Sequence, residues 1–361
     1  MRLFVCGDIM PGGILPYQEK YIDETLKNEM IQYDFRIGTL ESAIGEGYEF
    51  DEVKMKGRAN IIYARNEDML RLKEMGFDVV SLANNHICDL GDGGLENTIA
   101  QLKQLGIQYC GAGMNIEEAS RPAVVSKDGI TVAFLAYCIY DSPWLGYVKM
   151  AGENTPGVCP LEITKVIDDI RQAKSKYDKV VVLPHWGKEY SYVPLPETIE
   201  MTKQMIAAGA DAVMASHPHI IQPLVVKEGV PVCYSMGNFL FPDFYMVPPR
   251  PVWYPNRSED LSHIPEVESY IFPVERPVLR RWEPFSRYGR AVGLTIEGSK
   301  ITAKSIITHL SLDNIVSHGV LEFGMRYHLW KESFKINSNL FKTMLMGLRK
   351  AKKSLFPNRI I

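Results

Sequence analysis

Short apolar runs alternate along this chain with amphipathic stretches, and this alternation strongly restricts its fold. Residues 2–6, 35–40 and 179–183 have the length and apolar content of buried strands. Residues 18–32 and 95–105 instead have the pattern of helices, with apolar side chains at helical spacing in the second. Strands that alternate with helices are typical of α/β proteins. We therefore expect an α/β fold.

Polar side chains directly follow five of the apolar runs. Because the carboxyl ends of strands in an open α/β sheet converge on one crevice, we expect these side chains to lie near one another. Carboxylates, an amide and imidazoles together are the ligands of divalent metals. The set exceeds the needs of one tetrahedral ion and suits two ions that share a carboxylate, as in phosphate-ester hydrolysis. Its members are Asp8, Glu41, Asn85, His86, His185, His217 and His219.

Each of these residues also has a simpler explanation when it is taken alone. An aspartate after a strand, such as Asp8, is often a turn or helix-cap residue. His185, between Pro184 and Trp186, could be a packed core histidine. The spacing of His217 and His219 is more informative, because in extended backbone residues two apart point to the same side. The joint pattern favours a metal site.

Several short segments combine into a more specific pattern. They are GDIM (7–10), TLES (39–42), LANNH and its continuation (82–107), GAG (111–113), LPHWGKEY (183–190), GADAVMASHPHIIQP (209–223) and YSMGNFLF (234–241). In this order they resemble the bacterial capsule synthesis family CapA, also called the poly-γ-glutamate biosynthesis family, of the calcineurin-like metallophosphoesterase superfamily. The resemblance runs from residue 1 to about residue 241. It implies a four-layer α/β/β/α sandwich of two mixed sheets, with a two-metal centre at the strand ends.

The resemblance also implies how the metal ligands are shared. Asp8 matches the aspartate of the first motif, and Glu41 matches the carboxylate that bridges the two ions. His219 matches a ligand of the first ion, and His185 and His217 match ligands of the second. Together these residues would bind one or two divalent ions, for which Mn, Zn, Fe and Mg are the candidates.

Other motif positions imply roles at the substrate. Asn85 matches a metal ligand, and His86 matches a residue near the substrate that could donate a proton to the leaving oxygen as the catalytic acid. Asp89 either orients His86 or a ligand, or caps a helix. Glu189 and Asn238 match positions at the rim of the site. Asp89, Glu189 and Asn238 are therefore the candidate substrate-binding residues.

One position departs from the superfamily. Its first motif is Asp-x-His, whose histidine binds a metal, but this chain has Met10 there. A thioether is a poor ligand for ions held mainly by oxygen and imidazole. We therefore expect the first ion to bind weakly or only together with substrate. The site could then hold one ion in place of two.

Residues 242–290 differ in composition from the rest of the chain. They hold nine of the 22 prolines, seven arginines and no lysine. So many prolines exclude long helices and central strands. We predict that this insertion is a lid or wall of the site, within a domain that spans residues 1–310 and ends in a hairpin. Its arginines either bind an anion or pair with the seven acidic residues of the same segment.

The charge of the chain is concentrated at one end. The 361 residues carry a net charge of −3, yet residues 321–361 hold nine Lys or Arg and only two acidic residues. Residues 311–361 are predicted to form a basic helical extension. Its apolar side chains have near-helical spacing, so residues 334–356 either lie on an anionic membrane surface or pack on the acidic body.

Composition narrows the class of protein. A hydrophobic content of 46% excludes a disordered chain, and the near-neutral balance excludes a general nucleic-acid coat. We see neither a membrane-spanning run nor a signal peptide. Six scattered cysteines without a CxxC pair suggest reduced thiols, and hence the cytoplasm. A peripheral position at the inner face of the membrane is also compatible with this reading.

These observations favour a metal-dependent hydrolase, most simply a phosphoesterase, in capsule, exopolysaccharide or poly-γ-glutamate synthesis. Its partner would be an anionic small molecule or polymer, and not a nucleic acid. The alternative is a non-catalytic component that binds or exports an anionic polymer through a vestigial metal site. Retention of all matched ligands other than the one at position 10 favours the enzyme.

Overall fold

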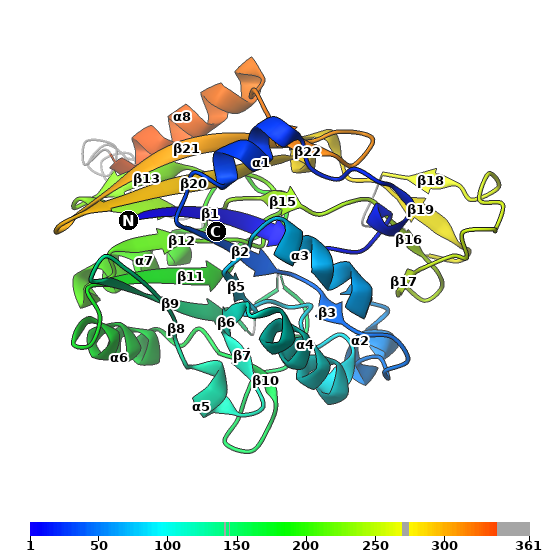
Figure 1. The fold of residues 1–361 in the computed structure, drawn as a ribbon, viewed down its shortest axis with the longest axis horizontal. Coiled ribbons are helices and arrows are strands. Elements are labelled where there is room, and N and C mark those ends of the chain that lie inside the picture. The colour runs from blue at the N-terminus through cyan, green and yellow to red at the C-terminus, as the bar shows by residue number, and fades with distance from the viewer. Residues whose placement is uncertain (141, 144, 269–273, 338–361) are drawn as a thin grey trace, which may run out of the picture.

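The structure is a computed structural model that describes residues 1–140, 142–143, 145–268 and 274–337. Two mixed sheets form its centre (Figure 1). The first has the order β22 (Val316–His318), β21 (Lys300–Leu310), β20 (Tyr288–Glu297), β1 (Arg2–Ile9), β2 (Phe35–Leu40), β5 (Val79–Ser81) and β6 (Gln108–Cys110), and β15 (Asn238–Leu240) also pairs with β1. The second has the order β13 (Leu224–Lys227), β14 (Val230–Cys233), β12 (Ala212–Met214), β11 (Lys179–His185), β9 (Ile130–Cys138) and β8 (Ala123–Lys127).

The side chains of β11 show how the layers pack. Val181 and Leu183 lie in the main core together with residues of the first sheet. Val180 and Val182, on the opposite face of the strand, pack with residues of the helices α6 (Ile163–Lys174) and α7 (Pro196–Ala208). This alternation, with apolar side chains on both faces, is what a fully covered strand requires.

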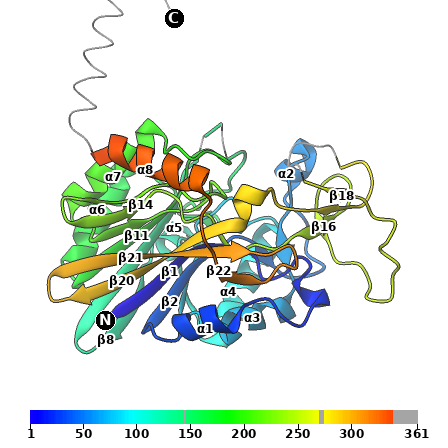
Figure 2. The same cartoon turned by 90° about the horizontal axis from the view of Figure 1, so that it is seen from above.

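Helices also cover the first sheet on its outer side (Figure 2). They are α1 (Glu24–Met30), α3 (Leu70–Glu74) and α4 (Gly91–Leu105), which add Leu26, Leu72 and Leu95 to the main core. The order helix, sheet, sheet, helix confirms the predicted four-layer α/β/β/α sandwich.

The helix expected over residues 18–32 is wrong at its start. Residues 15–17 form a short 3₁₀ turn, and α1 begins only at Glu24. Asp23 accounts for this start, because its side chain accepts a hydrogen bond of 2.9 Å from the backbone N–H of Thr25. The hairpin predicted near residues 297–300 is confirmed, since β20 and β21 pair along their whole length.

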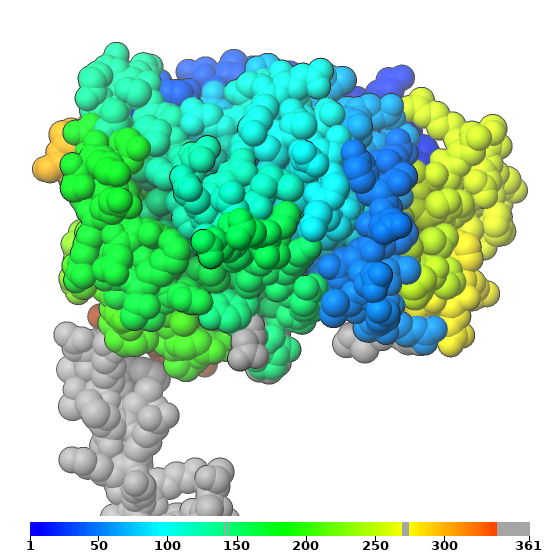
Figure 3. Space-filling view, turned by 90° about the horizontal axis from the view of Figure 1, so that it is seen from below, coloured from blue at the N-terminus to red at the C-terminus, as the bar shows by residue number. Residues whose placement is uncertain are grey.

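Residues 242–290 form a small sheet of very short strands. Its order is β17 (Val252–Trp253), β16 (Phe244–Met246), β19 (Val278–Arg280) and β18 (Glu266–Val267). The many prolines explain strands of only two or three residues. The segment borders the chain that follows α2 (Glu52–Gly57), through a bond of 2.9 Å from Val252 N to the Ile61 carbonyl, and Figure 3 shows the two segments in contact.

Three of the seven arginines of this segment, Arg280, Arg287 and Arg290, are buried. Arg287 forms a bidentate pair with the buried carboxylate of Asp243, at 2.7 and 2.8 Å. Arg281 bonds to both Glu266 and Asp243. Arg280 is also buried, and its guanidinium lies 4.1 Å from the ring centroid of Trp282 and 3.7 Å from a carboxylate oxygen of Glu283. Internal pairing therefore accounts for Arg281 and Arg287.

The helix α8 (Phe323–Asn337) lies on the outside of the molecule near β20 and β21 (Figure 1). Its residues Met325 and Leu329 pack on Ile221. The remainder of the predicted helical extension lies outside the described residues. Among the helices that the structure describes, none combines the length and apolar character that crossing a bilayer demands. The sheet also continues past residue 310, because β22 pairs with β21.

Candidate metal centre

Strand ends from both sheets bring the predicted residues together. Asp8 lies near the end of β1, opposite Thr39 of β2 and Asn238 of β15. Glu41 directly follows β2, and its backbone N–H donates to the Ile9 carbonyl at 2.9 Å. From the second sheet, His185 is the last residue of β11. The two sheets therefore contribute to one buried site, as the sequence predicted.

Two glycines allow the strands to approach this closely. A Cβ atom on Gly7 would lie 1.9 Å from the carbonyl oxygen of Gly237. One on Gly289 would lie 2.0 Å from the carbonyl oxygen of Asn238. Any larger residue would push β1 and β20 away from the β15 segment and displace Asp8.

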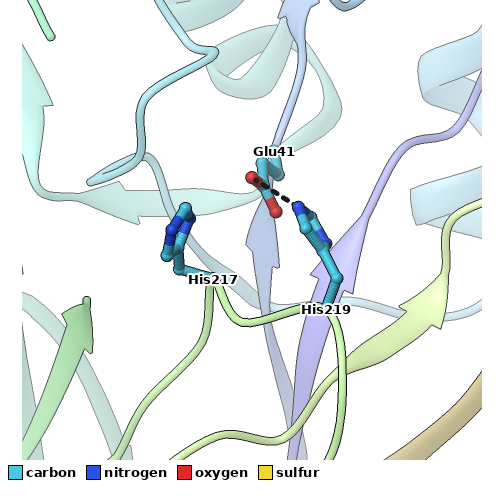
Figure 4. A group of neighbouring side chains, drawn as sticks. All are labelled: Glu41, His217 and His219. Atoms are coloured by element: carbon cyan, nitrogen blue, oxygen red, sulfur yellow. Dashed lines mark ion pairs between the residues drawn. The ribbon is translucent and has the colours of Figure 1, made fainter. Parts of the chain in front are cut away.

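His217 and His219 face the site for a different reason from the one predicted. Their φ angles are 101° and 54°, so the backbone is left-handed and not extended. Non-glycine residues adopt this conformation at a cost, and such strain gathers at functional sites. The turn nevertheless directs both imidazoles toward Glu41, which stands between them in Figure 4.

Glu41 is common to two sets of metal-ligand atoms. One set is Glu41, His217 and His219, and the other is Asp8, Glu41 and His185. Within each set the ligand atoms lie within 4.8 Å of one another. This grouping pairs the histidines differently from the resemblance, which places Asp8 and His219 together, but both groupings put Glu41 between two positions. The geometry thus suits a bridging carboxylate.

Nothing in the described protein neutralises these carboxylates. Both oxygens of Glu41 and Oδ1 of Asp8 are buried and accept no hydrogen bond from a described residue. The closest imidazole nitrogens, of His185 and His219, are 3.5 and 3.6 Å from Glu41 Oε1. Burial raises the pKa of Glu41 well above its usual value, and burial together with the charge of Glu41 does the same for the pKa of Asp8. The backbone N–H of His217 donates to the other oxygen of Asp8, Oδ2, at 3.3 Å. A buried acid pair with so few donors fits a bound cation.

Two of the histidines, His185 and His219, are neutral and oriented, as metal ligands must be. Burial lowers the pKa of His185 to about 4 and that of His219 to about 3. Ser216 Oγ lies 3.0 Å from His185 Nδ1, and Asn238 Oδ1 lies 2.9 Å from His219 Nδ1. The predicted ligand Asn85 places Oδ1 2.8 Å from His185 Nε2. The residues present therefore fit one or two divalent ions.

His86 contacts the buried ion pair of Asp89 and Lys54. Asp89 Oδ2 lies 2.7 Å from His86 Nδ1 and also accepts from the backbone N–H of Ile62 at 2.7 Å. The other oxygen, Oδ1, accepts from the ammonium of Lys54, which also bonds to the Asn85 carbonyl. Burial lowers the pKa of His86. His86 Nδ1 thus forms a hydrogen bond with Asp89, and Nε2 is the ring nitrogen that could contact a substrate.

The three weaker candidates have different positions. Asp89 has no accessible surface and does not cap α4, whose N-cap is Leu90, so its contacts favour the orienting role. Asn238 is buried against His219 and donates to the Ser286 carbonyl. Glu189 lies on the loop after β11, where burial raises its pKa to about 7. Of the three, Glu189 is the one that is only partly buried.

Sequence reasoning missed two groups beside the site. Lys54 is one of three lysines or arginines within residues 52–58, and this basic sequence does not indicate that its side chain is buried. Trp282 places its ring 5.0 Å from that of His219, and it belongs to the segment 242–290. Met10 lies with Trp282 in an apolar cluster and has no accessible surface. The missing histidine is therefore replaced by packing that links the insertion to the metal centre.

Known proteins resemble this chain over about its first two thirds, the part that contains the candidate metal centre. The profile of the family described as bacterial capsule synthesis protein PGA_cap matches residues 2–243. The PGA biosynthesis protein CapA of Bacillus subtilis (strain 168) is 32% identical over 244 residues, which cover 65% of this chain and 62% of the relative. The capsule biosynthesis protein CapA of Bacillus anthracis is 31% identical over 252 residues, covering 67% and 60%.

A solved structure described as a novel phosphatase of Mycoplasma pneumoniae aligns with a TM-score of 0.47 and 11% identity, over 93% of this chain and 98% of the other. The region that aligns with the two Bacillus proteins spans about three fifths of the length of each of them. It contains the strand-end residues that form the site. By this match, the chain belongs to the bacterial capsule synthesis protein family PGA_cap.

Proposed function

We propose that this protein is a divalent-metal-dependent hydrolase that cleaves phosphate esters. The position of Glu41 carries the proposal, because this buried carboxylate belongs to two ligand sets and accepts no hydrogen bond from a described residue. A pair of bound divalent ions supplies an activated water and stabilises negative charge on a phosphoryl oxygen.

Each ligand in this proposal comes from the chain itself. Oxygen and imidazole donors suit Mn, Zn, Fe or Mg. The ligands would be Asp8, Glu41, Asn85, His185, His217 and His219. Ser216 and Asn238 would hold two of the imidazoles in place. A rigid set of this kind gives the substrate a fixed position at the strand ends.

His86 would be the catalytic acid. In the protonated form of His86, which the charge of Asp89 favours, Nδ1–H would donate to Asp89 and Nε2–H would give its proton to the leaving oxygen of the ester, leaving a neutral imidazole. Asp89 and Lys54 act through His86 and are positioning residues. Glu189, at the rim, would contact the substrate. The substrate is an anion, small or polymeric, since the site is built around cations.

The test is hydrolysis of p-nitrophenyl phosphate, bis-p-nitrophenyl phosphate and an alkyl phosphate by the purified chain with added Mn²⁺. We expect Mn²⁺-dependent turnover that EDTA abolishes. A His86→Gln variant should lose about 10²–10⁴-fold on the alkyl ester, as expected for loss of an acid catalyst. It should lose less on the nitrophenyl esters, whose leaving groups need no proton.

The matched control is His318→Gln, which changes a more exposed histidine paired with Glu29. It should retain wild-type turnover. Equal losses of His86→Gln on all three esters would contradict the acid role. Bound metal without turnover on any ester would contradict the phosphoesterase and leave a binding role.

The relatives suggest where the reaction belongs. Their printed names connect them with PGA and capsule biosynthesis, and one of Mycobacterium tuberculosis is called a probable polyglutamine synthesis accessory protein. We place this chain in capsule, exopolysaccharide or poly-γ-glutamate synthesis. All six cysteines are free and buried, which suits a reducing compartment such as the cytoplasm.

A second function is a non-catalytic accessory that binds an anionic polymer. Met10 favours it, since the packing of this residue in an apolar cluster leaves the first ion with fewer ligands than the superfamily motif provides. The hydrolysis experiment separates the two functions.

A further inference from the structure

Helix α8 has two opposite apolar faces, and within residues 1–337, as far as they are described, only one of them packs on the body of the protein. Met325, Leu329 and Ile336 are buried against the body. The opposite face carries an aromatic row, namely Phe323, Tyr327, Trp330 and Phe334, which are 85%, 51%, 63% and 57% exposed. The spacing of four, three and four residues aligns these side chains along one side of the helix.

The aromatic row is a continuous surface. The rings of Tyr327 and Trp330 lie 6.0 Å apart, and those of Trp330 and Phe334 are stacked at 6.1 Å. Exposure of four neighbouring large aromatic side chains is unfavourable in water. Contiguous exposed apolar patches mark sites of interaction.

Positive charge borders the row on both sides. At about 100° per residue, Arg326 falls on one flank of the aromatic row and Lys331 on the other, and both residues are exposed. The acidic residue of α8, Glu332, is buried and pairs with Lys335. The sequence that follows α8, residues 338–361, contains six Lys or Arg and no acidic residue. The exposed surface of α8 is thus aromatic and basic, and the chain continues as basic sequence.

We propose that α8 lies flat on an anionic lipid membrane, with the aromatic row inserted at the headgroup level. Tryptophan and tyrosine favour this interface because their rings are apolar and their polar groups remain hydrated. Arg326 and Lys331 then face lipid phosphates, as in amphipathic helices that lie in the interface. This proposal does not depend on the metal chemistry.

A second copy of the chain is a less suitable occupant. In a twofold dimer the same face meets itself, so Arg326 and Lys331 of each copy would approach like charges. An anionic lipid surface instead complements both residues and the basic sequence that follows.

The test is flotation of the full chain with vesicles of phosphatidylcholine alone or mixed with phosphatidylglycerol. We expect binding only to the mixed vesicles, with a loss at high salt. A Tyr327→Ser/Trp330→Ser variant should bind at least tenfold more weakly. Its folding is checked by circular dichroism and thermal unfolding, since neither residue belongs to the buried face.

The matched control is Val226→Ser/Leu312→Ser, which changes two exposed apolar residues outside α8 that are 59% and 70% exposed. This variant should bind like the wild type. Equal binding of the aromatic variant and the wild type, or equal binding to neutral vesicles, would overturn the proposal. The proposal would also be overturned if sedimentation showed that the wild type is a dimer and the aromatic variant a monomer, while neither protein bound vesicles.

Discussion

Two buried carboxylates in this molecule have opposite surroundings. Asp243 is fully buried and accepts hydrogen bonds from Arg281, Arg287, Asn314 and the backbone of Trp282. Glu41 is equally buried, but no described residue donates a hydrogen bond to either of its oxygens. The protein therefore neutralises one carboxylate by itself and leaves the other for a group from outside.

The difference separates a structural charge from a functional one. Asp243 joins the insertion to the end of the first sheet, so its two arginines act as internal counter-ions. Glu41 stands at the strand ends with neutral imidazoles around it. Burial alone does not identify a site, whereas a buried carboxylate without donors needs an explanation, which a bound cation would supply at Glu41.

Removal of Asp243 should have the largest effect on stability. An Asp243→Ala change leaves Arg287 buried without its counter-ion, and breaking a buried pair in this way costs about 3–5 kcal/mol. The measurement is the free energy of unfolding from urea denaturation. Asp168→Ala, which breaks an exposed pair with Arg171, is the control and should cost less than about 1 kcal/mol. Similar losses in the two variants would contradict the structural role of Asp243.

Metal should stabilise the protein through Glu41. At a Mn²⁺ concentration of 100 times Kd, the free energy of unfolding should rise by about 2.7 kcal/mol. Glu41→Gln should lose most of this gain because it removes the charge shared by both ligand sets. The measurement is thermal unfolding with EDTA or Mn²⁺, and the exposed Glu197→Gln should respond like the wild type. An undiminished gain in Glu41→Gln would exclude Glu41 as a ligand.

The metal-free protein should respond to pH through the same residue. Because the folded pKa of Glu41 is raised, its contribution is complete below the unfolded value of about 4.3 and is lost as pH rises through the folded pKa. The slope for one group is at most about 1.4 kcal/mol per pH unit. In EDTA, the wild type should therefore lose stability relative to Glu41→Gln between pH 4.3 and neutral pH. Parallel curves for the two proteins would refute this expectation.

The sequence predicted the architecture well because β/α alternation is a local signal. The strand over residues 35–40 was located to the residue, and Glu41 follows it as expected. The start of α1 was missed because Asp23, a single cap, overrides a helical pattern that extends to residue 18. Local side-chain bonds of this kind compete with hydrophobic periodicity.

The sequence predicts that these residues lie near one another at the strand ends, but not the backbone geometry that brings them there. His217 and His219 meet Glu41 through left-handed backbone, which no periodicity rule anticipates. Lys54 reaches Asp89 across 35 residues of sequence, and its chain neighbours Val53 and Met55 are exposed and half-buried. Contacts of this range depend on the tertiary fold, so a single sequence cannot locate them.

The central place of β1 has a consequence for the order in which the protein is made. This first strand pairs with β2, β15 and β20, and the last of these begins at residue 288. A ribosome must therefore deliver nearly the whole described chain before Asp8 has its final neighbours. Contacts of such separation form late in folding. The first half of the chain holds Asp8, Glu41 and Asn85, whereas His185, His217 and His219 come later, so the proposed metal site is completed only after most of the chain has been made.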